Sequence, residues 1–309
     1  MKMNSIKTRL ASVAALVAVS VVSSTQIASA NVNVVATIPE LGAIAKDLGG
    51  DKVSVYSIAR PNSDYHAVEA RPSDVARVSR AGLVIRVGMG SDSWFDALAN
   101  ASGVRRVRPG GAGYVDASVG VPKIEVPTAQ ISGASGDVHP DGNPHYYYDP
   151  VYAKFAARNI VRGLIRVDAA NAETYRANYT RFNGTIDSRM AGWRSQLAPY
   201  AGRPVVTYHR SFNYFLRRFG MRQYGTLEPR PGIPPSAGHV QQLIRNMKRD
   251  SVRAIMVESV YPTRYPQLVA NQLGVRYVVG PYSVSSTNQG AYFNLIDTLV
   301  ARLRQAVAQ

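Results

Sequence analysis

Short apolar runs alternate with stretches of helical spacing over most of this chain, and that alternation restricts its fold more than any other feature. The expected strands are 32–38, 53–58, 83–87, 205–208, 254–257 and 275–279. The expected helices between and after them are 41–48, 73–79, 211–219, 240–247 and a closing amphipathic helix around residues 293–303. Strands that alternate with helices build βαβ units around a parallel sheet. The sequence therefore predicts an α/β protein.

A long helical segment interrupts the alternation near the middle of the chain. Helical spacing runs over 151–165 and again over 171–197, and the second stretch would be about 40 Å long at 1.5 Å per residue. We therefore expect two Rossmann-like lobes with parallel sheets, joined by a long backbone helix. The predicted boundaries are 31–168 for the N-terminal lobe, 169–199 for the interlobe helix and 200–309 for the C-terminal lobe. Ligands of open α/β sheets bind outside the carboxyl ends of the strands, so the site is expected in the cleft between the lobes.

The first thirty residues have the pattern of a cleaved secretory signal. Lys2, Lys7 and Arg9 form a basic start, an apolar run follows over 10–22, and the small residues 28–30 fit a cleavage site. The apolar run is shorter than the roughly 20 residues that a membrane-spanning helix needs. We expect export to a bacterial periplasm, with no stable insertion into the membrane.

Composition narrows the chemistry that the chain can carry. It has no cysteine, which excludes disulfide scaffolds, thiolate metal sites, iron–sulfur clusters, cysteine nucleophiles and a lipid-modified cysteine. The formal net charge is +16, but the arginines are scattered along the chain and export removes most nucleic-acid roles, so no nucleic-acid partner is expected. Metal or catalytic chemistry must therefore use His, Asp, Glu, Ser or Tyr.

Three of the five histidines occupy comparable places in the predicted fold. His66 follows the strand 53–58, His145 lies in a turn directly before a helix, and His209 comes directly after the strand 205–208. Each is delivered toward the predicted cleft by the end of a strand or by a turn. Neutral imidazole is the commonest protein ligand for first-row transition metals. This placement predicts a metal site built from three histidines.

The segments around these histidines also resemble a known family. They read DYHAVEARPSD over 64–74, NPHYYYDP over 143–150 and TYHRSFNYF over 207–215, with weaker matches at 88–94 and 235–236. In this order they resemble the cluster A-I solute-binding proteins of ABC transporters, which import zinc or manganese. The resemblance spans essentially the whole chain after residue 30. It implies two lobes, a long backbone helix and a buried metal between the lobes.

The resemblance also implies a ligand set. His66, His145 and His209 match the first three ligands of the family, whereas the acid that many members carry near the last strand has no counterpart in residues 280–286. The fourth ligand is then water or Glu258, the acid that ends the strand 254–257. Glu69 is expected to accept a hydrogen bond from an imidazole N–H. Because manganese prefers oxygen ligands and three imidazoles suit zinc, Zn²⁺ is expected rather than Mn²⁺.

These observations predict a monomeric periplasmic protein that binds zinc with high affinity and delivers it to an inner-membrane ABC permease, without enzymatic activity. A protein of the same family specific for manganese or another divalent ion is one alternative. A secreted zinc hydrolase with Glu69 or Glu258 as general base is another, and a metal-free adhesin or organic-solute-binding protein is a third. His139 is expected on the surface, His239 at the surface or as a helix cap, and the tyrosines 146–148 are expected to pack around the site. The turn 228–232 has no predicted role.

Overall fold

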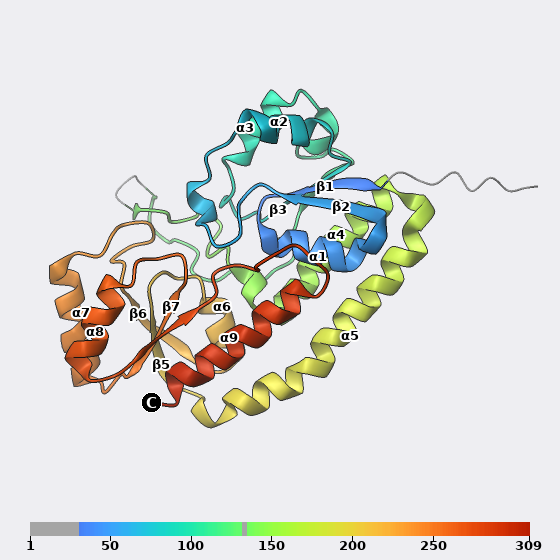
Figure 1. Cartoon of the computed structure of the whole chain (residues 1–309). Coiled ribbons are helices and arrows are strands. Elements are labelled where there is room, and N and C mark those ends of the chain that lie inside the picture. Colours follow the sequence, from blue (N-terminus) through green and yellow to red (C-terminus); the bar gives the residue numbers. More distant parts are fainter. Residues whose placement is uncertain (1–30, 132–134) are drawn as a thin grey trace, which may run out of the picture. The chain divides into compact units, whose positions relative to one another are not determined.

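Two parallel four-stranded sheets form the framework of the protein (Figure 1). The structure, a computed structural model, describes residues 31–131 and 135–309, so the predicted signal segment lies outside the described residues. The first sheet has the order β2-β1-β3-β4, from β1 (Val32–Ala36), β2 (Val53–Ser57), β3 (Leu83–Arg86) and β4 (Tyr114–Asp116). The second has the order β6-β5-β7-β8, from β5 (Pro204–Thr207), β6 (Arg222–Thr226), β7 (Ala254–Glu258) and β8 (Tyr277–Gly280).

The two sheets have the same topology, and all of their strand pairs are parallel. In each sheet the chain starts in an inner strand, adds a neighbour on one side and then crosses to the other side. The order of the strands therefore reverses between β1 and β3 in one sheet and between β5 and β7 in the other. Crevices for ligands open at such reversal points, outside the carboxyl ends of the strands. The predicted α/β architecture with two parallel sheets is confirmed.

Helices cover these sheets and connect their strands. Those of the first region are α1 (Pro39–Gly49), α2 (Pro72–Ser79), α3 (Phe95–Ala101) and α4 (Pro150–Val167). Those of the second are α6 (Asn213–Arg218), α7 (Ala237–Arg249), α8 (Arg264–Leu273) and α9 (Ala291–Val307). The side chain of Asp149 caps α4 by accepting a hydrogen bond from the Val151 N–H at 2.8 Å, and Pro150 occupies the first turn. Both features favour a helix start.

The long helix α5 (Ala172–Leu197) links the two regions, as predicted. It packs against α1 and α4 of the first region and against α9 of the second (Figure 1). Its buried side chains recur every three or four residues, which places them on one face: Tyr175, Asn178, Phe182, Ile186, Met190, Trp193 and Leu197. One continuous apolar core contains residues of both sheets together with this face of α5. The two regions therefore share packing rather than meeting only through a flexible linker.

Five elements differ from or add to the prediction. The strands β4 and β6 were not predicted, and neither were the helices α3 and α8. β8 covers Tyr277–Gly280 rather than 275–279. Both missed strands lie at sheet edges, and β6 is polar and only partly buried. None of the described helices combines the length and the apolar composition that a bilayer crossing requires.

Candidate metal centre

Three imidazole rings, from His66, His145 and His209, converge at the carboxyl ends of the strands. Each offers a ring nitrogen, and these three atoms lie within 4.8 Å of one another. The ring centroids are 5.3–5.8 Å apart and the ring planes are inclined by 53–73°, so the rings face a common point rather than stack. His145 and His209 are 1% and 3% exposed. The three histidines predicted to share a site are thus brought together.

The spacing of two of these nitrogens matches that of ligands on one ion. Nε2 of His66 and Nε2 of His145 are 3.3 Å apart. For a tetrahedral zinc ion with bonds of about 2.0–2.1 Å to nitrogen, two ligand atoms lie roughly 3.3 Å from each other. These two nitrogens therefore have the separation of two ligands on one tetrahedral ion.

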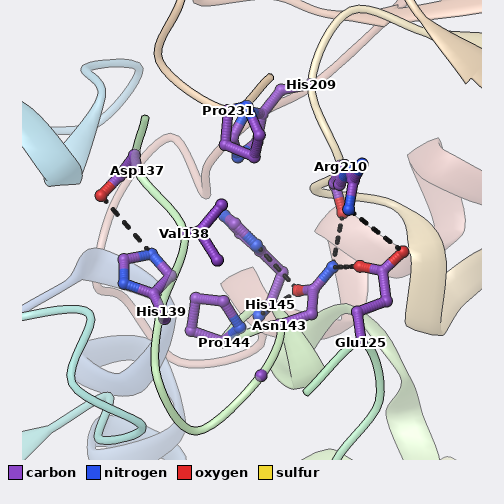
Figure 2. Close-up of a pocket in the computed structure, with 11 residues that line it drawn as sticks. Glu125, Asp137, Val138, His139, Asn143, Pro144, His145, His209, Arg210 and Pro231 are labelled. Carbon is purple, nitrogen blue, oxygen red and sulfur yellow. Dashed lines mark hydrogen bonds and ion pairs between the residues drawn. The ribbon is translucent and has the colours of Figure 1, made fainter. Parts of the chain in front are cut away.

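Asn143 fixes the orientation of the His145 ring. Its amide nitrogen donates to Glu125 Oε2 at 2.8 Å and to the Arg210 carbonyl at 2.9 Å, so its amide oxygen must face His145 (Figure 2). That oxygen accepts from the His145 backbone N–H at 2.9 Å and lies 3.0 Å from Nδ1. Because an amide oxygen only accepts, Nδ1 carries the proton and Nε2 keeps its lone pair. The lone pair then faces the other histidines.

Glu228 orients His209 in the same way. His209 follows β5, and its Nδ1 donates to Glu228 Oε2 at 2.8 Å, while that oxygen also lies 3.3 Å from the Gly232 N–H. The glutamate follows the neighbouring strand β6 and is 5% exposed. A carboxylate bound to one imidazole nitrogen leaves the opposite nitrogen free for a metal and raises its basicity. The turn 228–232, which had no predicted role, therefore supports His209.

Glu258 holds the backbone of His209 rather than joining the ring nitrogens. It ends β7, is fully buried, and accepts from the Tyr208 N–H at 3.1 Å and from the His209 N–H at 3.3 Å. It is not a member of the group whose ligand atoms lie within 4.8 Å of one another. The structure thus does not bring the predicted fourth ligand into the histidine cluster. Its carboxylate bridges the reversal point between β5 and β7.

The role predicted for Glu69 is corrected. Glu69 is exposed, and among the described residues the acceptors beside the imidazole Nδ1 atoms are Asn143, Glu228 and Asp137. Glu69 follows the short helical turn Tyr65–Ala67 that carries His66, and from there its side chain points to solvent. Its sequence proximity to His66 was the signal that misled the prediction.

Two aspartates position His66, one at its backbone and one at its ring. Its backbone N–H donates to Asp64 Oδ1 at 3.0 Å, and the hydroxyls of Tyr261 and Tyr282 reach the Asp64 carboxylate at 3.3 and 3.4 Å. The His66 Nδ1 lies 2.8 Å from Asp137 Oδ2. Residues that follow β7 and β8 therefore help to position a histidine that follows β2.

His139 is not a surface residue, contrary to the prediction. Its side chain is 9% exposed, and its ring stacks on His66 with centroids 5.0 Å apart and planes 18° apart. Burial and the neighbouring His66 lower its pKa to about 4. The tyrosines 146–148 are fully buried next to the site, as predicted, and Tyr147 and Tyr148 both contact the His145 ring.

The electrostatic surroundings differ between the histidines. Burial and the nearby imidazoles lower the pKa of His145 well below its usual value, so this ring stays neutral. Burial also disfavours a charged His209, but the hydrogen bond to Glu228 and the nearby carboxylates outweigh that effect and raise its pKa. Burial raises the pKa of Glu258 to about 7, although His209 opposes the shift.

A small cavity adjoins the cluster. It has a volume of about 30 Å³, and His139, His145, His209, Asp137 and Pro231 are among the residues that line it (Figure 2). That volume holds a water molecule or an ion, whereas pockets for organic ligands measure about 300–1,000 Å³. The space at this site therefore fits a small inorganic solute.

Comparisons with known proteins identify the family of this chain. A model of the family described as "ZnuA: Zinc-uptake complex component A periplasmic" matches residues 34–306. The iron-binding protein YfeA of Yersinia pestis is 26% identical over 249 residues, which are 79% of this chain and 75% of YfeA. The manganese ABC transporter substrate-binding lipoprotein PsaA of Streptococcus pneumoniae is 25% identical over 283 residues, which are 89% of this chain and 87% of PsaA.

A solved structure shares the fold. The crystal structure of ZnuA superposes with a TM-score of 0.74 at 21% identity, covering 89% of this chain and 99% of that chain. The family match extends over nearly all of the described residues and includes both sheets, the long helix and the three converging histidines. The chain belongs to the ZnuA family of cluster A-I metal-binding substrate-binding proteins of ABC transporters.

Proposed function

We propose that this protein captures one Zn²⁺ ion outside the cytoplasm through His66, His145 and His209 and delivers it to an ABC permease in the membrane. The observation that carries the proposal is the convergence of three imidazoles, two of which have Nδ1 bound to an acceptor and Nε2 free. The tautomer and the orientation of these two rings are therefore preorganised for binding a metal ion. The reaction is capture and release, and the ion is the cargo.

The donor set favours zinc among divalent ions. All three proposed ligand atoms are imidazole nitrogens, and the one cluster that contains them includes no carboxylate oxygen. Manganese prefers oxygen-rich sites, and its affinity for nitrogen ligands is lowest in the first-row series. Relatives named for iron and manganese belong to the same group of proteins, so family membership leaves the ion open and the donor chemistry supports zinc.

Water is the proposed fourth ligand. The buried Glu258 is engaged by two backbone N–H groups, which supports a role in positioning His209. A metal with three protein ligands and water also occurs in hydrolases. Here the small cavity beside the cluster fits an ion better than an organic substrate, and of the two acids that could act as general base Glu69 is exposed and Glu258 is engaged by backbone N–H groups. The ABC-transporter family consists of substrate-binding proteins, which further supports transport over catalysis.

Glu228 offers a test of how the site is oriented. Glu228→Ala is expected to lower zinc affinity by about 10–100-fold, because the His209 ring loses the acceptor that fixes its tautomer. Glu228→Gln keeps an acceptor oxygen and is expected to lose less. Competitive titration against a chromophoric chelator measures both. Glu69→Ala is the matched control and is expected to leave affinity unchanged; equal losses in Glu69→Ala and Glu228→Ala would contradict the assignment.

The proposed ion is tested by competition on the purified chain without its first thirty residues. The protein is stripped of metal with a chelator, mixed with equal concentrations of Zn²⁺ and Mn²⁺, desalted and subjected to elemental analysis. The proposal predicts about one zinc per chain and almost no manganese. Retention of manganese in preference to zinc would contradict zinc as the cargo, and retention of neither ion would contradict metal capture altogether.

A further inference from the structure

We propose that five arginines on the outer layer of the first region form a docking surface for anionic phospholipid headgroups, which holds the protein on a membrane surface. They lie on or beside the helices α2 and α3 and are called the α2–α3 arginine cluster: Arg77, Arg80, Arg105, Arg106 and Arg108. Capture of a cation does not explain the strongly basic charge of the chain, whereas attraction to an anionic surface does.

Folding makes the surface more basic than the composition alone indicates. The chain has 36 Lys and Arg residues and 20 Asp and Glu residues. Seven of these acids are buried in the described part of the chain: Glu40, Asp47, Asp74, Asp92, Asp149, Glu228 and Glu258. Among the described Lys and Arg residues, only Arg86 is buried. The excess of positive charge therefore lies at the surface, where it attracts anions.

Two segments that are separate in the sequence meet at the end of α2. Arg77 and Arg80 are three residues apart at this end, and residues at that spacing lie on the same face of a helix. The segment 105–108 follows α3, which lies beside α2 on the face of the first sheet away from α1 (Figure 1). The Arg106 Nε donates to the Ala81 carbonyl at 3.1 Å. The fold therefore gathers arginines that are scattered along the sequence.

Backbone carbonyls hold these guanidinium groups by one nitrogen and leave the other nitrogens available. The Arg80 Nε donates to the Ala76 carbonyl at 3.2 Å, as the Arg106 Nε does to Ala81. The terminal Nη nitrogens of Arg80 and Arg106 have no hydrogen bond to the described residues. A guanidinium group that is held in this way offers paired N–H donors with the geometry that phosphate oxygens accept.

The carboxylates of the same layer do not neutralise the cluster. Asp74 is fully buried beside Arg71, and Asp92 and Asp96 pair with Arg86. In the part of the chain that the structure describes, no ion pair joins a carboxylate to any of the five arginines. Their positive charges are therefore available to an external anion.

The exposure of the cluster fits an extended anionic surface. Arg77, Arg80, Arg105 and Arg106 are exposed, and they are spread over the ends of two helices rather than around a cavity. Several phosphate groups side by side, as at the surface of an anionic bilayer, match this spread. Attraction between basic side chains and anionic headgroups binds a protein reversibly without inserting it into the bilayer.

The cluster and the metal centre lie at opposite ends of the strands. The helix α2 ends before β3 begins, and residues 105–107 precede β4, so the cluster lies at the amino ends of these strands. His66 and His209 follow the carboxyl ends of β2 and β5. A membrane surface bound at the cluster would therefore leave the metal centre uncovered. Such reversible attachment would also keep the protein near a permease in the same membrane.

Sedimentation with vesicles tests the docking surface. The chain without its first thirty residues is mixed with vesicles of phosphatidylcholine, with or without phosphatidylglycerol, and the bound fraction is measured after centrifugation. Binding is expected only to the vesicles with phosphatidylglycerol, and added salt is expected to weaken it. Binding to neither kind of vesicle, or equal binding to both, would overturn the proposal. A higher affinity for a DNA duplex than for the anionic vesicles at the same salt concentration would also overturn it.

Substitutions within the cluster test its location. The triple variant Arg80→Gln/Arg105→Gln/Arg106→Gln is expected to bind the anionic vesicles about 100-fold more weakly, because each Lys or Arg near such a surface contributes roughly fivefold. The corresponding triple lysine variant keeps the charges and is expected to retain most of the binding. Circular dichroism shows that each variant is folded. Equally weak binding by the lysine and glutamine variants would contradict attraction by charge.

A matched control removes three charges from another surface. The triple variant Arg245→Gln/Lys248→Gln/Arg253→Gln changes exposed residues on and beside α7 and is expected to weaken vesicle binding by at most about threefold. Equal weakening by both triple glutamine variants would contradict a docking surface at α2 and α3. Both variants are expected to bind zinc as the wild type does, because neither changes the metal centre. Failure of the docking surface and failure of the proposed function are therefore distinguishable.

Discussion

Replacing His145 or His209 by alanine is expected to lower zinc affinity by at least about 100-fold. Loss of a hydrogen-bond partner behind a metal-bound histidine already costs 10–100-fold, and loss of the ligand itself removes a bond to the metal. The same change at His66 is expected to have a comparable effect, because its Nε2 completes the set. Competitive titration with a chelator of known affinity measures each variant.

Two controls distinguish the loss of a metal ligand from misfolding of the variant. His239→Ala removes a histidine of α7 and is expected to bind zinc as the wild type does. Thermal unfolding of each metal-free variant shows whether the fold persists, and added zinc should raise the unfolding temperature of the wild type far more than that of the variants, since ligand binding stabilises the native state. Affinities within about threefold of wild type in all three histidine variants would contradict the assigned ligands.

Asp92→Ala is expected to cost about 3–5 kcal/mol of the free energy of unfolding, the largest stability effect that the structure predicts. Asp92 is fully buried where β1 and β3 end. Its Oδ1 accepts from Arg86 at 3.2 Å, and its Oδ2 accepts from the Thr37 hydroxyl and the Val87 N–H, both at 2.7 Å. Alanine would leave the guanidinium, 8% exposed, without its buried partner. Urea denaturation monitored by circular dichroism measures the change.

Asp96 provides a matched control on the same arginine. Asp96 also pairs with Arg86, but its side chain is 54% exposed, so Asp96→Ala is expected to cost at most about 1 kcal/mol. The double variant Arg86→Met/Asp92→Ala is expected to lose less stability than Asp92→Ala, because it leaves no unpaired buried charge. Similar losses of unfolding free energy for Asp92→Ala and Asp96→Ala would contradict the claim that burial makes the Arg86–Asp92 pair the more costly one to break.

The fold could be predicted where the apolar pattern was strong. β1, β3, β5 and β7 lie inside their sheets and carry buried apolar runs, so the sequence predicted them. The helix α5 was predicted within one residue because its buried face repeats over seven turns of regular spacing. β4 has only three residues, and β6 is a polar edge strand. β6 is only partly buried, so it lacks the continuous apolar run by which a buried parallel strand is identified.

The missed strand β6 explains why Glu228 was missed at the site. Glu228 lies two residues after the end of β6, and β6 is parallel to β5, which precedes His209. Carboxyl ends of neighbouring parallel strands meet at one edge of a sheet, so a prediction of β6 would have placed Glu228 beside His209. The three histidines were found because each lies close to a recognisable strand or helix. Asp137 and His139 come from a loop without periodic pattern, and only the folded chain brings them to His66.

The central claim is that three imidazole nitrogens hold a single ion, and a crystal structure of the zinc-loaded chain with anomalous data at the zinc absorption edge tests it most directly. The account predicts one strong anomalous peak about 2.0–2.1 Å from a ring nitrogen of each of His66, His145 and His209. A peak elsewhere on the chain, or none at these nitrogens in protein that retains zinc, would contradict it.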